Sequence, residues 1–218
     1  MDVTPVWATP NGDDLIVEMA RVSAPENAKN KDTGPRLINY LIKHNHWSPF
    51  EMVNMCLEIH TTRAISPQIL RHRSFAFQEF SQRYANTNSI GRMEMPQLRA
   101  QDHKNRQNST DDLVNVLGYE EYMSICRKVR THLEDSEHLY QELVSKGVAK
   151  ESARFVLSSA APTKLYMNGQ VRSWIHYINL RSDPSTQKEH REIAERAKNI
   201  FKNYFPITSE ALWTQQSN

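Results

Sequence analysis

A dense run of charged residues carries the clearest chemical signal in the sequence. Residues 71–84 read RHRSFAFQEFSQRY and contain three arginines, a histidine, a glutamate and two serines. Arginine presents a planar fork of N–H donors that matches a phosphate, so Arg71, Arg73 and Arg83 suit a phosphorylated substrate or cofactor. Glu79 is the lone carboxylate among these cations and could accept from a ribose hydroxyl or an amide N–H. The run therefore predicts a site for a phosphorylated ligand.

The same run has a second interpretation, as a basic surface helix in which Glu79 pairs with a neighbouring arginine. Exposed ion pairs of that kind are common and contribute little to stability. If the stretch is extended instead, Glu79, Ser81 and Arg83 share one face, because side chains alternate along a strand. There they could grip a single ligand. Residue types alone leave both interpretations open.

The order of these residues resembles the signature of the flavin-dependent thymidylate synthases, R-H-R-x-x-S-x-N-E-x-S-x-R-Y. The positions in register are Arg71, His72, Arg73, Glu79, Ser81, Arg83 and Tyr84. Ala76 stands where the family has serine, and Gln78 stands where it has asparagine. One hydroxyl is therefore lost, whereas an amide is kept one methylene longer.

Further segments extend the resemblance over most of the chain. Residues 46–51, HWSPFE, look like the family's H-x-[ST]-P-[FL]-E, with Met52 in place of the following histidine, and Gln68 precedes Arg71 by three positions as in the family. The blocks G-x-x-x-E-x-A-R and R-S…N-L-R are matched by Gly147, Glu151, Ala153 and Arg154, and by Arg172, Ser173, Asn179, Leu180 and Arg181. Departures from the family pattern fall at Ser158, Gln170 and His176.

The resemblance implies two sets of ligand contacts. For FAD they are Ser48, Arg71, His72, Arg73, Glu79, Gln170, Val171 (mainly through its backbone), Arg172 and His176. For dUMP they are Gln68, Arg71, Glu79, Ser81, Gln82, Arg83, Arg154 and Arg181. Arg181 corresponds to the arginine thought to stabilise a uracil ring that has lost its N3 proton, which makes carbon 5 reactive. The implied catalytic role is electrostatic stabilisation by Arg181.

The implied activity is the reductive methylation of dUMP to dTMP. 5,10-Methylenetetrahydrofolate would donate the carbon, FAD would carry the hydride, and NADPH would recharge the flavin. His46 and Tyr84 are weaker candidates for folate or nucleotide contacts. The family forms homotetramers with active sites between subunits, so we expect the same assembly here. No metal site is predicted.

Several of these residues also have ordinary structural interpretations. Ser48 could form a turn or helix cap before Pro49, and Arg154 could pair with Glu151 on a helix surface. His72 and His176 could be hydrogen-bonded histidines of a core or interface. For the whole chain, two alternatives remain: a nucleotide- or RNA-binding module without turnover, and a family member that has lost catalysis.

The two cysteines bear on the mechanism. A classical thymidylate synthase attacks the uracil ring with a thiolate, which needs cationic neighbours and access to substrate. Cys56 falls within a predicted strand and Cys126 within a predicted helix, so both are predicted to be reduced core thiols. Their separation also lacks the close spacing of a zinc site or a redox pair.

Composition excludes several broad classes. The 218 residues are 39% hydrophobic and 24% charged, with no apolar stretch of membrane-spanning length. A net charge of +2 is too small to indicate nucleic-acid binding. The N-terminal residues MDVTPVWATPNGDD lack a basic head followed by an apolar run, so we expect a cytoplasmic protein.

Helices and strands must position these residues. Residues 52–61 alternate apolar and polar side chains and predict a strand with one buried face, and residues 164–167 predict a second. Helices are predicted after Asp13 or Asp14 as the cap, around residues 37–42, from Ser66 as cap to His72, over 111–146 with a stop at Gly147, around 151–157 and 172–180, and from Pro184 to Tyr204. Residues 85–112 predict a long polar loop of the kind that often forms a lid.

These elements do not alternate regularly, which disfavours a doubly wound sheet. The sequence predicts an α+β fold, with a mixed or antiparallel sheet flanked by long helices in one oligomeric domain spanning 1–218. It contains no glycine-rich dinucleotide turn. Any FAD must therefore be held by side chains and subunit contacts.

Overall fold

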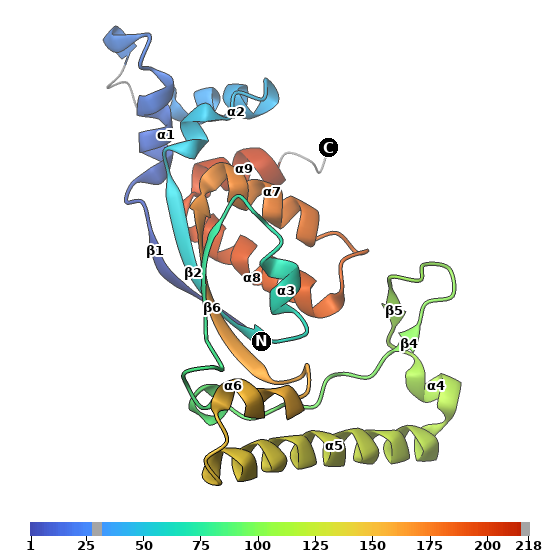
Figure 1. Ribbon diagram of the computed structural model, residues 1–218. Coiled ribbons are helices and arrows are strands. Elements are labelled where there is room, and N and C mark those ends of the chain that lie inside the picture. Colours follow the sequence, from blue (N-terminus) through green and yellow to red (C-terminus); the bar gives the residue numbers. More distant parts are fainter. Residues whose placement is uncertain (28–31, 215–218) are drawn as a thin grey trace.

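The protein is built around one antiparallel sheet, shown by a computed structural model that describes residues 1–27 and 32–214 (Figure 1). Four strands lie in the order β1-β2-β6-β3, and each neighbouring pair is antiparallel. Their bounds are β1 Asp2–Ala8, β2 Asn54–Thr62, β6 Pro162–Gln170 and β3 Ala76–Glu79. With helices beside this sheet, the α+β prediction is confirmed.

The two central strands bury one face completely. Met55, Leu57 and Ile59 of β2 are inaccessible to solvent, and so are Leu165 and Met167 of β6. Leu57 lies opposite Met167 and Ile59 opposite Leu165 in the ladder. Each such side chain contributes about 1.5–3 kcal/mol by leaving water. The alternation that predicted the first strand is thus the pattern that builds the core, and the second strand is longer than predicted.

Three C-terminal helices lie beside this sheet in Figure 1. They are α7 Val171–Arg181, α8 Lys188–Tyr204 and α9 Pro206–Trp213. Trp174 of α7 is fully buried and donates its indole N–H to the Met55 carbonyl at 2.8 Å. Its ring meets Phe75 edge to face, with centroids 4.9 Å apart. Phe75 in turn packs on Gly169 so closely that a Cβ there would lie 2.4 Å from the ring, so only glycine fits.

The N-terminal helices are α1 Gly12–Ala20 and α2 Gly34–Lys43. The prediction that Asp13 or Asp14 caps α1 is wrong, because the helix follows Asn11, whose side chain makes no cap hydrogen bond. Asp13 is buried and caps α9 instead: its carboxylate accepts from the Ile207 N–H at 2.8 Å and the Thr208 hydroxyl at 2.6 Å. The carboxylate thereby joins the first helix to the last.

The longest helix, α5 Tyr119–Ser145, lies apart from α7, α8 and α9 (Figure 1). It follows α4 Leu113–Leu117 and a small hairpin of β4 Ala100–Gln101 and β5 Ser109–Thr110. Only Leu133, Ser136 and Tyr140 of α5 are buried. Gly147 ends this region in the left-handed conformation (φ 87°), which confirms the predicted stop.

Other boundaries differ from the sequence predictions. Ile65, not Ser66, precedes the short helix α3 (Ser66–Ile69), which ends before Arg71. The helix predicted from Pro184 begins at Lys188, and β1 and α9 were not predicted. The remaining elements are α3 Ser66–Ile69, α6 Lys150–Ala153, η1 Pro25–Asn27, η2 Ser48–Glu51, η3 Thr87–Ile90 and η4 Arg154–Val156. Within the described ranges, no helix has the length and apolar character needed to cross a bilayer.

Candidate active site

A pocket of about 510 Å³ opens where β6 passes directly into α7. Its volume lies within the range of about 300–1,000 Å³ that is usual for small-molecule sites. Three predicted flavin contacts, Gln170, Arg172 and His176, line it. The other lining residues are Trp47, Glu51, Ser74, Ser173, Ile175 and Asn179. The pocket therefore combines aromatic, amide, cationic and anionic side chains.

The strand-to-helix junction positions these groups. Gln170 has extended backbone and Val171 begins α7, so the chain turns sharply at the pocket. The Val171 N–H donates to the Val53 carbonyl at 2.8 Å, which commits that backbone donor to the fold. Arg172 is ion-paired with Glu51 of η2. The predicted contact Ser48 is exposed on η2 and does not line the pocket.

The C-terminal end of α7 holds the predicted catalytic residue. Arg181 donates its Nε–H to Nε2 of His72 at 2.9 Å, although the two residues are 109 positions apart. Because arginine cannot accept, His72 must present a lone pair at Nε2 and carry its proton on Nδ1. Burial, followed by the charges of Arg181 and His176, lowers the pKa of His72 to about 4. His72 is thus a neutral acceptor that orients the guanidinium.

Gln68 joins the same region through a buried histidine. Its Oε1 lies 3.3 Å from Nδ1 of His190, and Nε2 of His190 lies 3.2 Å from the Tyr177 hydroxyl. Both His190 and Tyr177 are fully buried. Burial, followed by Arg181 and His72, lowers the pKa of His190 to about 3. We refer to Gln68, His72, Tyr177, Arg181 and His190 as the Gln68 cluster.

A second group of predicted residues gathers where β3 ends. Glu79 accepts from the Thr163 hydroxyl at 3.0 Å and pairs with Arg63 at 2.7 Å. Arg83 lies 3.6 Å from Glu151 of α6, and both side chains are more than half exposed. Arg154 follows on η4, where its guanidinium stands over the ring of Phe155. We refer to Glu79, Arg83, Glu151 and Arg154 as the Glu79 cluster.

The prediction that Glu79, Ser81 and Arg83 share one strand face is wrong. The strand ends at Glu79, and the Arg83 N–H donates to the Ser81 hydroxyl at 3.4 Å within the turn that follows. Gln82 in this turn is buried, and its Nε2 has no hydrogen-bond partner in the described part of the chain. The turn is tied to α6, because Lys150 donates to the Tyr84 carbonyl at 3.0 Å.

The Glu79 cluster and the pocket lie at different places along the sheet. Glu79 of β3 lies opposite Leu165 of β6 in the sheet, whereas Gln170 is the last residue of β6. Five steps of about 3.4 Å along β6 separate them by roughly 17 Å. One copy of the chain therefore does not bring all the predicted contacts into one pocket.

Two arginines of the signature remain open to solvent. Arg71 and Arg73 are exposed, and neither forms an ion pair among residues 1–27 and 32–214. Both are free to meet a phosphate. The substituted positions Ala76 and Gln78 are exposed on β3, opposite Asn168 and Tyr166 of β6. Both substitutions therefore fall outside the buried Gln68 cluster.

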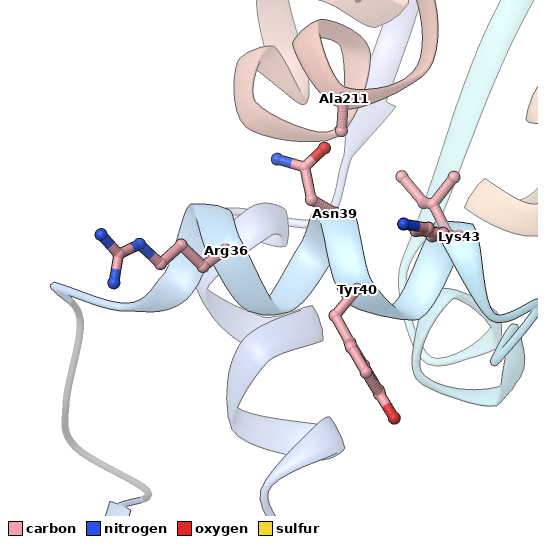
Figure 2. A pocket seen from close by; sticks show the side chains of 6 residues that line it. Arg36, Asn39, Tyr40, Lys43 and Ala211 are labelled. Carbon is pink, nitrogen blue, oxygen red and sulfur yellow. The ribbon is translucent and has the colours of Figure 1, made fainter.

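A second hollow, of about 430 Å³, lies over α2 and contains none of the predicted site residues. Figure 2 shows that Arg36 and Tyr40 point away from each other there, while Asn39 points towards Ala211. Such divergent side chains give a ligand no common target. The pocket at α7 is therefore the better candidate.

The cysteines lie away from both clusters. Cys56 is buried within β2, and burial raises the pKa of its thiol, which disfavours a thiolate. Cys126 lies in α5 and is partly exposed, so the prediction of a core position is wrong for this residue. Neither lines the pocket at α7.

Sequence reasoning missed several residues of this region. Trp47 and Glu51 lie in the HWSPFE segment, so the segment could have indicated them. Tyr177 and His190 lie on helices predicted from periodicity alone, and nothing in their spacing indicated that they meet Gln68. Their partners lie on different elements, and only the folded chain brings them together.

Known proteins resemble this chain over most of its length. A family model described as "Thymidylate synthase complementing protein" matches residues 6–207. A flavin-dependent thymidylate synthase of Synechocystis is 49% identical, covering 91% of this chain and 88% of the relative. A protein named probable flavin-dependent thymidylate synthase, from Paramecium bursaria Chlorella virus 1, is 47% identical over 92% and 90%. The crystal structure of a UMP/dUMP methylase from Streptomyces cacaoi, bound to 5-Br dUMP, superposes with a TM-score of 0.80 at 26% identity, covering 96% of this chain and 93% of that one.

Proposed function

Because this chain belongs to the thymidylate synthase complementing protein family, we propose that it is a flavin-dependent thymidylate synthase. It converts dUMP to dTMP, with 5,10-methylenetetrahydrofolate as carbon donor and NADPH as the source of reducing equivalents. FAD, when bound, supplies the hydride that completes the methyl group. The protein contributes binding, orientation and electrostatics.

The observation that carries this proposal is the contact between Arg181 and His72. The neutral imidazole of His72 accepts the Nε–H of Arg181. The two terminal nitrogens of the Arg181 guanidinium therefore keep their N–H donors for a ligand. A guanidinium held in that way can stabilise the negative charge that develops on the uracil oxygens when N3 loses its proton. His72 fixes the orientation of the Arg181 guanidinium and, being neutral, leaves its positive charge in place.

The pocket at α7 fits the isoalloxazine ring of a flavin in size and chemistry. Trp47 offers an aromatic wall, Gln170 can both donate to and accept from a ring amide, and Arg172 supplies a cation. Arg71 and Arg73 are exposed and can meet the pyrophosphate. These are the residues to which we assign FAD, together with the predicted contacts Ser48, His72, Glu79, Val171 and His176.

The Glu79 cluster supplies the dUMP phosphate site in our proposal. Arg83 and Arg154 carry the cations that a phosphate dianion demands, and the buried Gln82 amide has an unused donor. Glu79 can accept from the ribose hydroxyl. These groups act with Ser81, Arg71 and the Gln68 cluster, which receives the base.

A single chain separates the Glu79 cluster from the pocket at α7, so we propose that two copies complete each site within a homotetramer. The separation of roughly 17 Å along β6 supports this arrangement. Tyr84 and Phe155, beside the Glu79 cluster, are 76% and 83% exposed. Large apolar side chains of this kind often mark a protein contact. A second copy would cover them while delivering its own Arg181.

The proposal is tested by colour and product. The purified protein should carry flavin absorption, or acquire it when FAD is added, and should form dTMP from dUMP only when methylenetetrahydrofolate and NADPH are both present. Chromatography of the nucleotides measures the product. Reactions that lack one component serve as controls. A colourless protein that fails to turn over dUMP after FAD addition would refute the assignment.

A further inference from the structure

His190 occupies a place that neither the family signature nor the pocket accounts for. It lies on the buried side of α8, between α3 and α7, which Figure 1 shows near one another. It is a fully buried imidazole with a polar partner on each nitrogen, Gln68 of α3 and Tyr177 of α7. An apolar residue would fill this core position without the cost of burying a polar ring.

The hydrogen-bonding capacity of the partners fixes the direction of each bond. The Gln68 oxygen can only accept, so Nδ1 of His190 must carry the proton and donate to it. Nε2 of His190 then has a lone pair and accepts from the Tyr177 hydroxyl. The imidazole is thus held as one tautomer, and it presents a donor to Gln68.

The other half of the Gln68 amide is equally constrained. Its Nε2 donates to Oε1 of Gln187 at 2.7 Å, and Gln187 donates to Glu189 at 3.0 Å. Glu189 is held by Arg99, whose two terminal nitrogens donate to it at 2.7 and 2.9 Å. Gln68 therefore cannot rotate its amide by half a turn without breaking bonds at both ends. One lone pair and one N–H of this amide stay available for a ligand.

We propose that His190 is a positioning residue for the uracil base, which acts by holding the Gln68 amide in one orientation. The inference rests on the proposed function, because Gln68 is an assigned dUMP contact. With His190 in place, the free edge of Gln68 always presents the same pattern of donor and acceptor to the ring. Without it, only the bond to Gln187 still opposes rotation, so the amide presents the reversed pattern for a larger fraction of the time.

Two nearly isosteric variants separate the two nitrogens of the ring. Asparagine places its amide nitrogen near the position of Nδ1, so His190→Asn keeps a donor towards Gln68. Glutamine reaches the position of Nε2, so His190→Gln keeps contact with Tyr177 and loses the donor towards Gln68. His190→Leu removes both contacts. Phe201→Leu alters another fully buried side chain of the same helix and serves as the control for lost packing.

The measurement is dUMP affinity by calorimetry on the FAD-loaded protein, alongside the flavin spectrum and the melting temperature. His190→Leu and His190→Gln should bind dUMP about tenfold more weakly with FAD retained, and His190→Asn should recover most of the loss. Phe201→Leu should lower the melting temperature with dUMP affinity unchanged. The inference is overturned if His190→Leu binds dUMP like the wild type, or if asparagine is no better than glutamine. A wild type that retains FAD but does not bind dUMP would instead refute the proposed function.

Discussion

The Gln68 cluster and the Glu79 cluster differ in how far their polar and charged side chains are exposed to solvent. In the first, the imidazole and phenol groups are buried, the Gln68 amide is half-buried, and each polar contact is directed by the chemistry of its partner. In the second, Arg83 and Glu151 are 53% and 60% exposed and lie 3.6 Å apart. An exposed pair of that kind contributes little to stability. Its guanidinium is therefore available for a ligand.

The difference indicates how one chain divides the work. A buried cluster is already organised before any ligand arrives, which suits the stabilisation of charge in a reacting ring. An exposed basic cluster attracts and holds an anion, and it becomes enclosed only when another surface covers it. Changes of pH and of side-chain shape should therefore alter the stability and activity that depend on the Gln68 cluster. Salt concentration and subunit assembly should instead alter the ligand binding that depends on the Glu79 cluster.

The largest effect is expected at the centre of the Gln68 cluster. Arg181→Ala should lower the rate of dTMP formation by at least about a hundredfold, because a charge-stabilising group in the transition state is lost. Flavin content should be retained, since Arg181 does not line the pocket at α7. Single-turnover kinetics and the visible spectrum measure the two properties. Arg196→Ala, a change at an exposed arginine of α8 outside both clusters, is the control and should keep full turnover.

Mixing two defective variants tests whether the two clusters meet across a subunit boundary. Arg181→Ala and the double variant Arg83→Ala/Arg154→Ala should each be nearly inactive alone. After subunit exchange, some sites would combine an intact Gln68 cluster with an intact Glu79 cluster from another copy, so activity should return. Exchange is verified by mass spectrometry of mixed assemblies. If mixed assemblies form and turnover does not return, the two clusters act within one chain.

The buried cluster should make stability depend on pH. An unfolded histidine takes up a proton below about pH 6.5, whereas folded His190, with a pKa of about 3, stays neutral at pH 5. Lowering the pH from 7 to 5 therefore favours the unfolded state, and His190 accounts for about 2 kcal/mol of the lost stability. His190→Leu should show a correspondingly smaller drop in unfolding free energy, measured by urea denaturation. Between pH 7 and pH 5, the unfolding free energy of Arg83→Ala should drop as much as that of the wild type. An equal drop in the wild type, His190→Leu and Arg83→Ala would contradict the argument.

The exposed cluster should instead reveal itself through salt. Arg83→Ala should weaken dUMP binding by about tenfold at low ionic strength, because a charge-assisted contact to phosphate is lost. The gap between variant and wild type should narrow as salt is added, since exposed charges are screened. Arg127→Ala, an exposed arginine of α5, controls for net charge and should leave binding unchanged. A salt-independent difference would mean that Arg83 acts by shape and not by charge.

Local pattern predicted more of the fold than of the site. The alternation in residues 52–61 gave β2, because period-two hydrophobicity and burial have the same cause. Asp13 was assigned to the wrong helix, since a capping residue looks the same whether its partner is near or far in sequence. Arg181 and Gln68 were found by resemblance alone. His190 was missed because its role exists only when α3, α7 and α8 pack together.

The smallest effect on turnover is expected from substitutions of the two cysteines, which belong to neither cluster. Cys56→Ala and Cys126→Ala should each leave the rate of dTMP formation within about twofold of the wild type, because charge stabilisation by Arg181 needs no thiolate. Cys56→Ala will lower the melting temperature slightly, since it removes a buried sulfur from β2. Each variant needs a flavin spectrum and a melting curve, so that turnover is compared between folded proteins. A folded, flavin-loaded cysteine variant without turnover would restore the thiolate mechanism and remove the need for the Arg181–His72 contact.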